Sequence, residues 1–326
     1  MSMLKLIKRT VMFYWRTNLG VLLTVVVSSA VLTGALTIGD SVHYSLIMLT
    51  KARLGDTDLA LVAQNRFFRA ALADELAEKI DVTAAPVLNV RGLISNDDGS
   101  KRANRVEVRG VDERFYAIGS TSNPWALGGS DGVIVNGSLA ARLNVAIGDE
   151  VVLRVEKPSL MPRDMPLTPD TGLSTAFRLK VLAVADAGDF GRFNLQANQI
   201  APLNVFVPLK WLGEKLERSG QANMMLLAGD SSGAIDVELA EKTLRENWRL
   251  ADAELELRRL ENPDVFELRS RRVFIDESVS KAAIGVSGQA GGIMTYFVNE
   301  LRSGDKATPF SMVAALDPSE GSGVIS

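Results

Sequence analysis

The sequence has no cysteine and only one histidine, His43. Without cysteine, disulfide bonds, thiolate catalysis and cysteine-ligated metal sites are excluded. A reaction that needs an imidazole would have to use His43, and a metal site with two histidine ligands cannot form. The formal net charge is only -3. A strongly basic surface is therefore not indicated, and we expect no nucleic-acid partner.

Long hydrophobic runs are also scarce, and one uncharged stretch, Leu19–Ile38, is long enough to cross a bilayer. As a helix it would measure roughly 30 Å, the thickness of the hydrocarbon core. Its apolar residues point all round the helix, as lipid-facing residues do. We predict a transmembrane helix over residues 17–39. Four residues represent this membrane anchor along its length: Leu19, Val26, Leu32 and Ile38.

The charges that flank this helix predict its orientation. The first acidic residue of the chain is Asp40, whereas four basic residues precede the apolar run. These are Lys5, Lys8, Arg9 and Arg16. Because basic flanks stay in the cytoplasm, residues 1–16 are expected to be a cytoplasmic, basic amphipathic segment, with the bulk of the chain outside the cytoplasm. A cleaved secretory signal is the alternative interpretation, and it sends the remainder to the same side.

Residues 40–54 are predicted to form a helical stalk, with a new turn at Ser41 and an end at Gly55. Strand patterns follow at 58–63, 85–94, 104–111, 133–135, 150–155, 177–185, 205–207, 224–227, 253–260 and 271–275. Helix patterns lie at 66–80, 138–143, 209–217 and 235–248. Their alternation indicates a mixed α/β (α+β) extracytoplasmic domain over residues 55–326, which we expect to contain two subdomains.

Three local patterns add detail. The helix at 66–80 is expected to bury Phe68, Leu72, Leu76 and Ile80 on one face. Residues 157–174 hold four prolines and are predicted to be an exposed loop. The segment Val106–Phe115 has a short counterpart in Phe310–Pro318: each is a strand pattern that ends in a small residue, an aliphatic residue and an aspartate. Few residues follow the second copy. This echo predicts a domain that is incomplete at its C-terminus.

The residue types that could carry out chemistry have ordinary structural roles in this sequence. No G-x-x-x-x-G-K-[ST] sequence for nucleotide phosphates occurs, and a serine nucleophile would have only His43 as an imidazole base. His43 is expected to be a surface or interfacial residue. The aspartate pairs Asp97–Asp98 and Asp186–Asp189 fall where turns are expected, which aspartate favours. We therefore predict no catalytic, cofactor or metal site.

Two further groups have structural interpretations. Five arginines, offset by nearby glutamates, are interpreted as a solvated strand face: Arg258, Arg259, Arg269, Arg271 and Arg272. Phe190 and Phe193 lie in an expected loop, where an aromatic side chain either enters the core or contacts a partner. For these two we favour the core.

The segment VNGSLAARLNVAIGDEVVL (residues 135–153) lies in this α/β pattern, downstream of a basic-flanked span. A strand-to-helix junction, VFVPL, follows at Val205–Leu209. In this order the features resemble the FtsX/MacB-type permeases of ABC transporters, and in particular the MacB-like periplasmic core domain. Members of that family have further transmembrane helices after this domain. The nearest candidate here, Ala282–Val298, contains Ser287, Gln289 and four glycines. The chain thus resembles the first part of such a permease, as a truncated product or a fragment.

The resemblance implies a transport role and not an enzyme. ATP would be hydrolysed by a separate ATP-binding subunit, and the resulting motion would pass along the first span into the external domain. The implied cargo is lipoprotein, lipid or small toxic molecules, and the implied location is the cell inner membrane, with lipid and a second permease protomer as partners. Two rival functions remain: a stand-alone membrane-anchored binding or scaffold protein, and an anchored hydrolase, for which the sequence offers no site.

Overall fold

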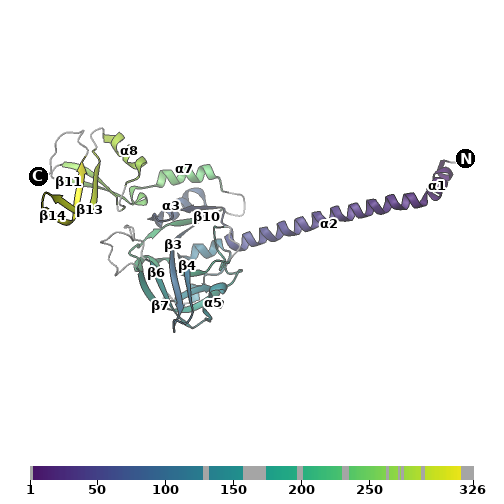
Figure 1. Ribbon diagram of the computed structural model, residues 1–326, viewed down its shortest axis with the longest axis horizontal. Coiled ribbons are helices and arrows are strands. Elements are labelled where there is room, and N and C mark those ends of the chain that lie inside the picture. The colour runs from purple at the N-terminus through teal and green to yellow at the C-terminus, as the bar shows by residue number, and fades with distance from the viewer. Residues whose placement is uncertain are drawn as a thin grey trace. The chain divides into compact units, whose positions relative to one another are not determined.

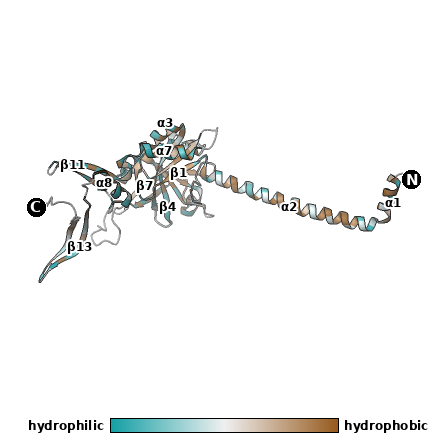
Figure 2. Ribbon diagram, turned by 90° about the horizontal axis from the view of Figure 1, so that it is seen from above, coloured by the Kyte–Doolittle hydropathy of each residue, from teal (hydrophilic) through white to brown (hydrophobic). Residues whose placement is uncertain are grey.

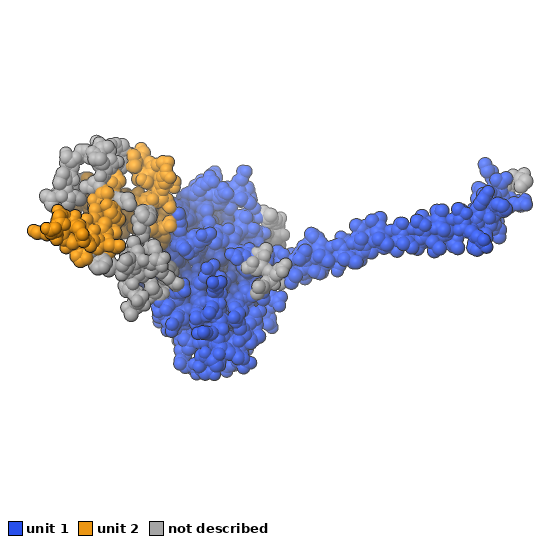
Figure 3. Space-filling view, viewed as in Figure 1, with its two compact units in different colours: residues 1–158, 169–248 blue, residues 159–168, 249–326 orange. Residues whose placement is uncertain are grey.

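The structure, a computed structural model, describes residues 3–127, 132–156, 174–196, 201–229, 235–261, 264–270, 272, 275–287 and 291–316. The chain divides into two units (Figure 1, Figure 3). The first comprises residues 1–158 and 169–248, and the second residues 159–168 and 249–326. The first unit contains the N-terminal helices and a large sheet, whereas the second contains two strand pairs and a helix.

The first unit begins with two helices, α1 (Met3–Phe13) and α2 (Trp15–Leu54). α2 runs without a break through the predicted anchor and stalk. The predicted new turn at Ser41 is wrong, because the preceding helical turns already satisfy the backbone there and no cap is needed. The predicted end is right: Gly55 has φ +58°, and its amide donates to the Lys51 carbonyl at 2.7 Å.

An eight-stranded sheet follows, in the order β1-β10-β3-β4-β8-β5-β7-β6. Its strands are β1 (Leu59–Val62), β3 (Val82–Asn96), β4 (Arg102–Val111), β5 (Gly132–Asn136), β6 (Glu150–Glu156), β7 (Ser174–Ala185), β8 (Asn204–Pro208) and β10 (Met224–Gly229). A short pair, β2 (Phe68–Arg69) and β9 (Gln221–Ala222), lies apart from it. The helices of this unit are α3 (Ala71–Ile80), α4 (Glu113–Ile118), η1 (Pro124–Leu127), α5 (Gly137–Leu143), α6 (Leu209–Lys215) and α7 (Val237–Asn247).

Most of this sheet closes on itself. β3 pairs with β4 along one side, and its last residues pair with β6 along the other. The path β3-β4-β8-β5-β7-β6 therefore returns to β3. The first residues of β3 instead pair with β10, which carries β1 at the edge. Because β3 is long, its two halves serve two different parts of the sheet.

Alternation along the strands supplies three hydrophobic clusters. One face of the closed part gathers Val106, Val108, Val133, Val135, Val151, Leu153, Val205 and Val207, together with side chains of α5 and α6. The opposite face of β5 and β8 presents Ile134 and Phe206 to α4 and to the segment after β7. A third cluster packs Leu72 and Leu76 of α3 on β10. Since buried apolar area is the main stabilising contribution, these clusters hold the unit together.

The expected helix over residues 66–80 is partly wrong. Phe68 lies in β2, and the helix α3 begins only at Ala71. Phe68 is nevertheless buried, because β2 pairs with β9 and places its side chain in the cluster beneath α3. The prediction that Phe68 is buried is therefore right, although Phe68 lies in a strand and not in the predicted helix.

The second unit contains η2 (Leu250–Ala253), β11 (Leu255–Glu261), β12 (Asp264–Ser270), α8 (Glu277–Ser287), β13 (Ile293–Ser303) and β14 (Lys306–Leu316). β11 pairs with β12, and β13 with β14, both antiparallel. The strand expected at 271–275 is not found at its described residues, Arg272 and Ile275, because the partner of β11 is β12. Positions 271, 273 and 274, and the proline-rich segment 157–173, lie outside the described residues.

Candidate functional site

α2 contains the candidate membrane span. Residues Trp15–Lys51 form a helix that is long and apolar enough to cross a membrane. The predicted anchor residues Leu19, Val26, Leu32 and Ile38 are all exposed on it. Two of its threonines bond inside the helix: the hydroxyls of Thr24 and Thr37 donate to carbonyls one turn earlier at 2.9 and 2.8 Å. These two hydroxyls are thus satisfied without water, which the interior of a bilayer would require. Figure 2 shows hydrophobic residues dominating the part of α2 next to α1.

The basic flank lies on α1 and at the first turn of α2. Lys5, Lys8 and Arg9 lie on α1 and are exposed, and Arg16 places its guanidinium 5.6 Å from the ring centre of Trp15. Tyr14 separates the two helices, although its amide still donates to the Thr10 carbonyl at 3.1 Å. The four basic residues therefore lie at the N-terminal end of the candidate span.

The junction between α2 and the sheet is the centre of the candidate site. After Gly55, the Asp56 amide donates to the Ile118 carbonyl at 2.9 Å, and the Ser120 hydroxyl donates to Asp56 Oδ2 at 2.7 Å. Ile118 is the last residue of α4. The Asp58 amide donates to the Leu227 carbonyl of β10 at 2.9 Å. The end of α2 is therefore hydrogen-bonded to α4, and the chain just beyond it to the sheet.

Space at this junction is fully used. A Cβ atom on Gly55 would lie 2.6 Å from the Ile118 carbonyl oxygen and 3.1 Å from the Phe190 ring. A Cβ atom on Gly119 would lie 2.6 Å from Cδ1 of Phe190. Only glycine fits at either position, since real Cβ contacts are not that short. The end of α2, the end of α4 and the Phe190 ring are therefore in direct contact.

Phe190 belongs to an aromatic cluster beside the sheet. Its ring centre lies 4.8 Å from that of Phe115 and 5.1 Å from that of Phe193, and Phe115 lies 5.7 Å from Phe206 on β8. Phe190 and Phe193 are almost completely buried, so the predicted core position of both is confirmed. The Asn204 side-chain amide holds their loop by donating to the carbonyls of Gly191 and Phe193, each at 2.9 Å.

Arg109 lies under this loop. It is only 3% exposed, and its guanidinium carbon lies 5.0 Å from the centre of the Phe193 ring. Burial lowers the pKa of Arg109 to about 10, although the carboxylate of Glu107 opposes that shift. The group therefore stays cationic at neutral pH. Its pattern in the sequence, RVEVRGV, is that of an exposed strand residue, and nothing there indicates burial.

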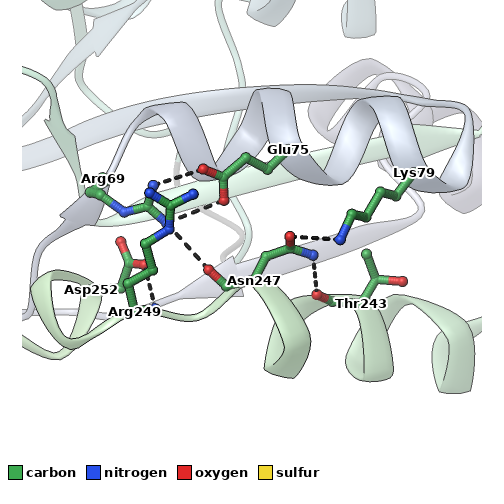
Figure 4. Close-up of polar contacts among 7 residues, drawn as sticks. All are labelled: Arg69, Glu75, Lys79, Thr243, Asn247, Arg249 and Asp252. Atoms are coloured by element: carbon green, nitrogen blue, oxygen red, sulfur yellow. Dashed lines mark hydrogen bonds and ion pairs between the residues drawn. The ribbon is translucent and has the colours of Figure 1, made fainter.

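A second polar network joins α7 to α3, near the end of the first unit (Figure 4). Arg69 donates from Nη1 and Nη2 to the two carboxylate oxygens of Glu75 at 2.8 and 3.2 Å, and also to the Asn247 carbonyl at 3.3 Å. Lys79 donates to Asn247 Oδ1 at 2.8 Å, while Asn247 Nδ2 donates to the Thr243 carbonyl at 2.7 Å. These contacts fix the last turn of α7 on α3.

The residues considered for chemistry have structural roles. Asp98 accepts from the Ser100 amide at 2.9 Å, a hydrogen bond that holds the pKa of Asp98 below its usual range. Asp97 pairs with Arg178, and Asp189 accepts from the Asp186 amide at 3.1 Å. His43 is exposed on α2. Within the described ranges, no group of three or more histidine, cysteine or acidic residues is placed to hold a metal.

The predicted charged strand face is found for Arg258, Arg259 and Arg269, which lie in β11 and β12, whereas Arg272 lies beyond the end of β12. In the β11–β12 pair, Arg258 lies opposite Glu267 and Arg269 lies opposite Glu256. Opposite charges across a strand pair stabilise it modestly, so these arginines are balanced by acidic neighbours. Arg271 lies outside the described residues.

Comparison with known proteins identifies the family of this chain. Residues 19–248 match the family described as MacB-like periplasmic core domain. No curated protein matches the chain. One similar solved structure is the periplasmic region of MacB from Actinobacillus actinomycetemcomitans, with 12% identity, a TM-score of 0.40, and coverage of 72% of this chain and 95% of that one. Another is the extracellular domain of the noncanonic ABC-type transporter YknZ from Gram-positive bacteria, with 10% identity, a TM-score of 0.34, and coverage of 57% and 88%. The family match confirms the resemblance drawn from the sequence, and the chain belongs to the MacB-like periplasmic core domain family of ABC-type transporter permeases.

Proposed function

We propose that this chain is a membrane-spanning permease subunit that couples a separate ATP-binding subunit to its extracytoplasmic domain. α2 is the transmitter: residues 17–39 cross the cell inner membrane and residues 40–54 form the stalk. The N-terminus lies in the cytoplasm with the basic residues of α1. Motion driven by ATP would pass along α2 and act on lipoprotein, lipid or small toxic molecules outside, with a second permease protomer and membrane lipid as partners.

The observation that carries this proposal is the continuity from α2 into the domain. α2 extends unbroken from Trp15 to Leu54, and within four residues of its end the backbone bonds both to α4 and to β10. A helix is stiff along its axis, and packed elements respond to displacement as units because interiors are close-packed. A shift or rotation of α2 would therefore reach Ile118 and Phe190 directly.

The test follows ATP-driven movement at two places on the full chain in membranes, together with its ATP-binding subunit. Because the chain has no cysteine, a single fluorophore can be attached at Ser45→Cys on the stalk or at Lys101→Cys in the β3–β4 turn. ATP is expected to change the emission at both positions. A short glycine–serine insertion between Leu54 and Gly55 should abolish the response at Lys101→Cys and preserve it at Ser45→Cys, because it separates α2 from the contacts of Gly55 and Asp56 with α4.

The same insertion at Gly304, in the β13–β14 turn, is the matched control and should leave both responses intact. If the domain still responds with the insertion after Leu54, the junction does not transmit the motion. If neither position responds to ATP in the presence of any co-purified ATP-binding subunit, the chain is better described as an anchored binding or scaffold protein.

A further inference from the structure

Arg109 carries a buried positive charge whose hydrogen-bonding capacity is largely unused. Within the described residues, Nε and Nη1 have no hydrogen-bond partner. Two acceptors are also unsatisfied: Oδ1 of Asn89, which lies opposite Arg109 on β3, and Oδ1 of Asn204. Asn204 bonds to the Phe193 backbone, and Arg109 lies under the Phe193 ring, so the three side chains share one patch of the sheet.

Buried polar groups like these destabilise the fold unless a ligand or water satisfies their hydrogen bonds. A buried guanidinium without a partner costs free energy, because it has lost its hydration and gained nothing equivalent. The carboxylate that acts on Arg109, that of Glu107, accepts from Asn89 Nδ2 at 3.1 Å and lies 3.9 Å from Arg91 Nε. It raises the pKa of Arg109 only enough to oppose part of the effect of burial. A ligand that satisfies both the Arg109 donors and the two Oδ1 acceptors would be anionic and would also donate hydrogen bonds.

The chemistry of the patch narrows that ligand. A guanidinium binds phosphate and carboxylate oxygens through its fork of N–H groups. The free Oδ1 atoms of Asn89 and Asn204 accept hydrogen bonds and would repel a ligand that carries only oxygen acceptors. A phosphate with a hydroxyl or amino donor satisfies both requirements. Hydrogen phosphate and the glycerol-bearing head group of phosphatidylglycerol share this chemistry.

The cover of the patch is connected to α2. Phe193 covers the guanidinium, Phe193 contacts Phe190, and Phe190 fills the space left by Gly55 and Gly119. Phe190 itself has φ +60°, a left-handed conformation that is unfavourable for a residue with a side chain. A movement of α2 at Gly55 would therefore displace Phe190 first and Phe193 next.

We propose that Arg109, Asn89 and Asn204 form a covered binding site for a donor-bearing phosphate group, which Phe193 closes in this structure. The binding site stands on its own residues, whereas its opening by α2 rests on the function proposed above. In the closed state the site is inaccessible, and displacement of Phe190 and Phe193 by α2 exposes the guanidinium to the ligand.

The first test measures how fast an arginine-selective dicarbonyl reagent modifies Arg109 in the full chain in phosphatidylcholine bilayers, by mass spectrometry. Arg91 is the internal reference, because its side chain is 75% exposed. In the wild type Arg109 should react about tenfold or more slowly than Arg91, as for a group reached only through local opening. Phe193→Ala, and the milder Phe193→Leu, should raise the rate at Arg109 and leave Arg91 unchanged. Equal rates at Arg109 and Arg91 in the wild type would overturn the covered site.

The second test adds the ligand. Inorganic phosphate should protect Arg109 from the reagent in the Phe193 variants and raise the unfolding temperature of Phe193→Leu, but not that of the double variant Phe193→Leu with Arg109→Met. Bilayers containing phosphatidylglycerol should protect without added phosphate if a lipid head group is the source, whereas phosphatidylcholine, which lacks a donor, should not. Glu107→Gln should strengthen protection by removing a repelling charge. If neither phosphate nor phosphatidylglycerol protects, the patch holds internal water only and the proposal is wrong.

These outcomes separate the site from the proposed coupling. Protection by phosphate without any effect of ATP on the rate at Arg109 would keep the site and remove its control by α2. An ATP response at Lys101→Cys without phosphate protection would keep the coupling and remove the site.

Discussion

The Asp56 amide donates a hydrogen bond to the Ile118 carbonyl at 2.9 Å, which ties the residue after Gly55 to the end of α4. The same carbonyl oxygen would lie only 2.6 Å from a Cβ atom on Gly55, too close for any side chain there. The contact between α2 and the domain therefore requires a glycine at position 55 as well as the hydrogen bond from Asp56. The junction can be tested without knowing what the protein transports.

Gly55→Ala should destabilise the first unit by about 2 kcal/mol or more, because the left-handed backbone is strained and the new Cβ meets a backbone oxygen that cannot move alone. Gly99→Ala is the control: Gly99 also has a positive φ, +71°, but nothing lies within 4 Å of the added atom. It should cost only about 1 kcal/mol. Denaturant unfolding of the full chain in detergent measures both. Equal losses of stability in Gly55→Ala and Gly99→Ala would show that the Ile118 carbonyl moves aside at little cost.

Gly119 and Phe190 should behave as one unit in a double-mutant cycle. Gly119→Ala forces a methyl group against the Phe190 ring, at an expected cost of ~1–3 kcal/mol. Phe190→Ala creates a cavity and should cost ~3–5 kcal/mol, but it also removes the two shortest contacts with the added methyl group, those of ring atoms Cδ1 at 2.6 Å and Cγ at 2.7 Å. The double variant should therefore lose less stability than the two single losses combined. Pairing Gly119→Ala with Leu212→Ala, in a different cluster, should be additive within ~0.5 kcal/mol.

Asn204→Ala should release the loop that carries Phe190 and Phe193. It removes two hydrogen bonds to buried backbone carbonyls, so a loss of about 2 kcal/mol or more is expected, with faster amide exchange in residues 190–196. Asn194→Ala serves as the control, since Asn194 lies in the same loop but bonds only to the nearby Gln196 amide at 3.0 Å. If the two variants exchange alike, Asn204 does not hold the loop.

Asn247→Ala should loosen the last turn of α7 from α3, because it removes the contacts with Lys79 and with the Thr243 carbonyl. We expect a loss of about 1 kcal/mol in the free energy of unfolding, with faster hydrogen exchange in α7 and unchanged exchange in β4. The comparison variant Glu241→Ala breaks the exposed pair with Arg245 and should cost ~0.5 kcal/mol or less. A loss for Asn247→Ala no larger than this would assign the network no role in fixing α7.

The predicted topology can be checked with single cysteines, since the natural chain has none. A membrane-impermeant maleimide added to cells with a permeabilised outer envelope should label Lys101→Cys at once. Thr10→Cys should react only after the inner membrane is opened, because the basic flank holds α1 in the cytoplasm. The mass of the mature chain is measured in parallel. Loss of the first residues would favour the cleaved signal, and immediate labelling of Thr10→Cys would reverse the orientation.

Local patterns predicted much of the fold. The turn at Asp97–Asp98, the strand, helix and strand at 133–135, 138–143 and 150–155, and the apolar run of α2 could be predicted because strand alternation, helical spacing and turn residues act over a few neighbours. The burial of Phe190 and Phe193 was also predictable, since few loop aromatics stay in water. Phe68 shows the limit: its spacing from Leu72 is that of a helix, yet pairing with Ala222 places it in a strand. That partner is far away in the sequence, so no local pattern could reveal it.

The sequence by itself determined the candidate span with its basic flank, the alternation of strands and helices, and the end of α2 at Gly55, because each depends on residues adjacent in the chain. Only the tertiary structure decided why Gly55 must be glycine, which residues Phe190 touches, and that Arg109 is buried under Phe193. Those facts depend on close approach between α2, α4, β4 and the segment after β7. Such approach is fixed by packing of side chains distant in sequence, which composition and periodicity do not specify.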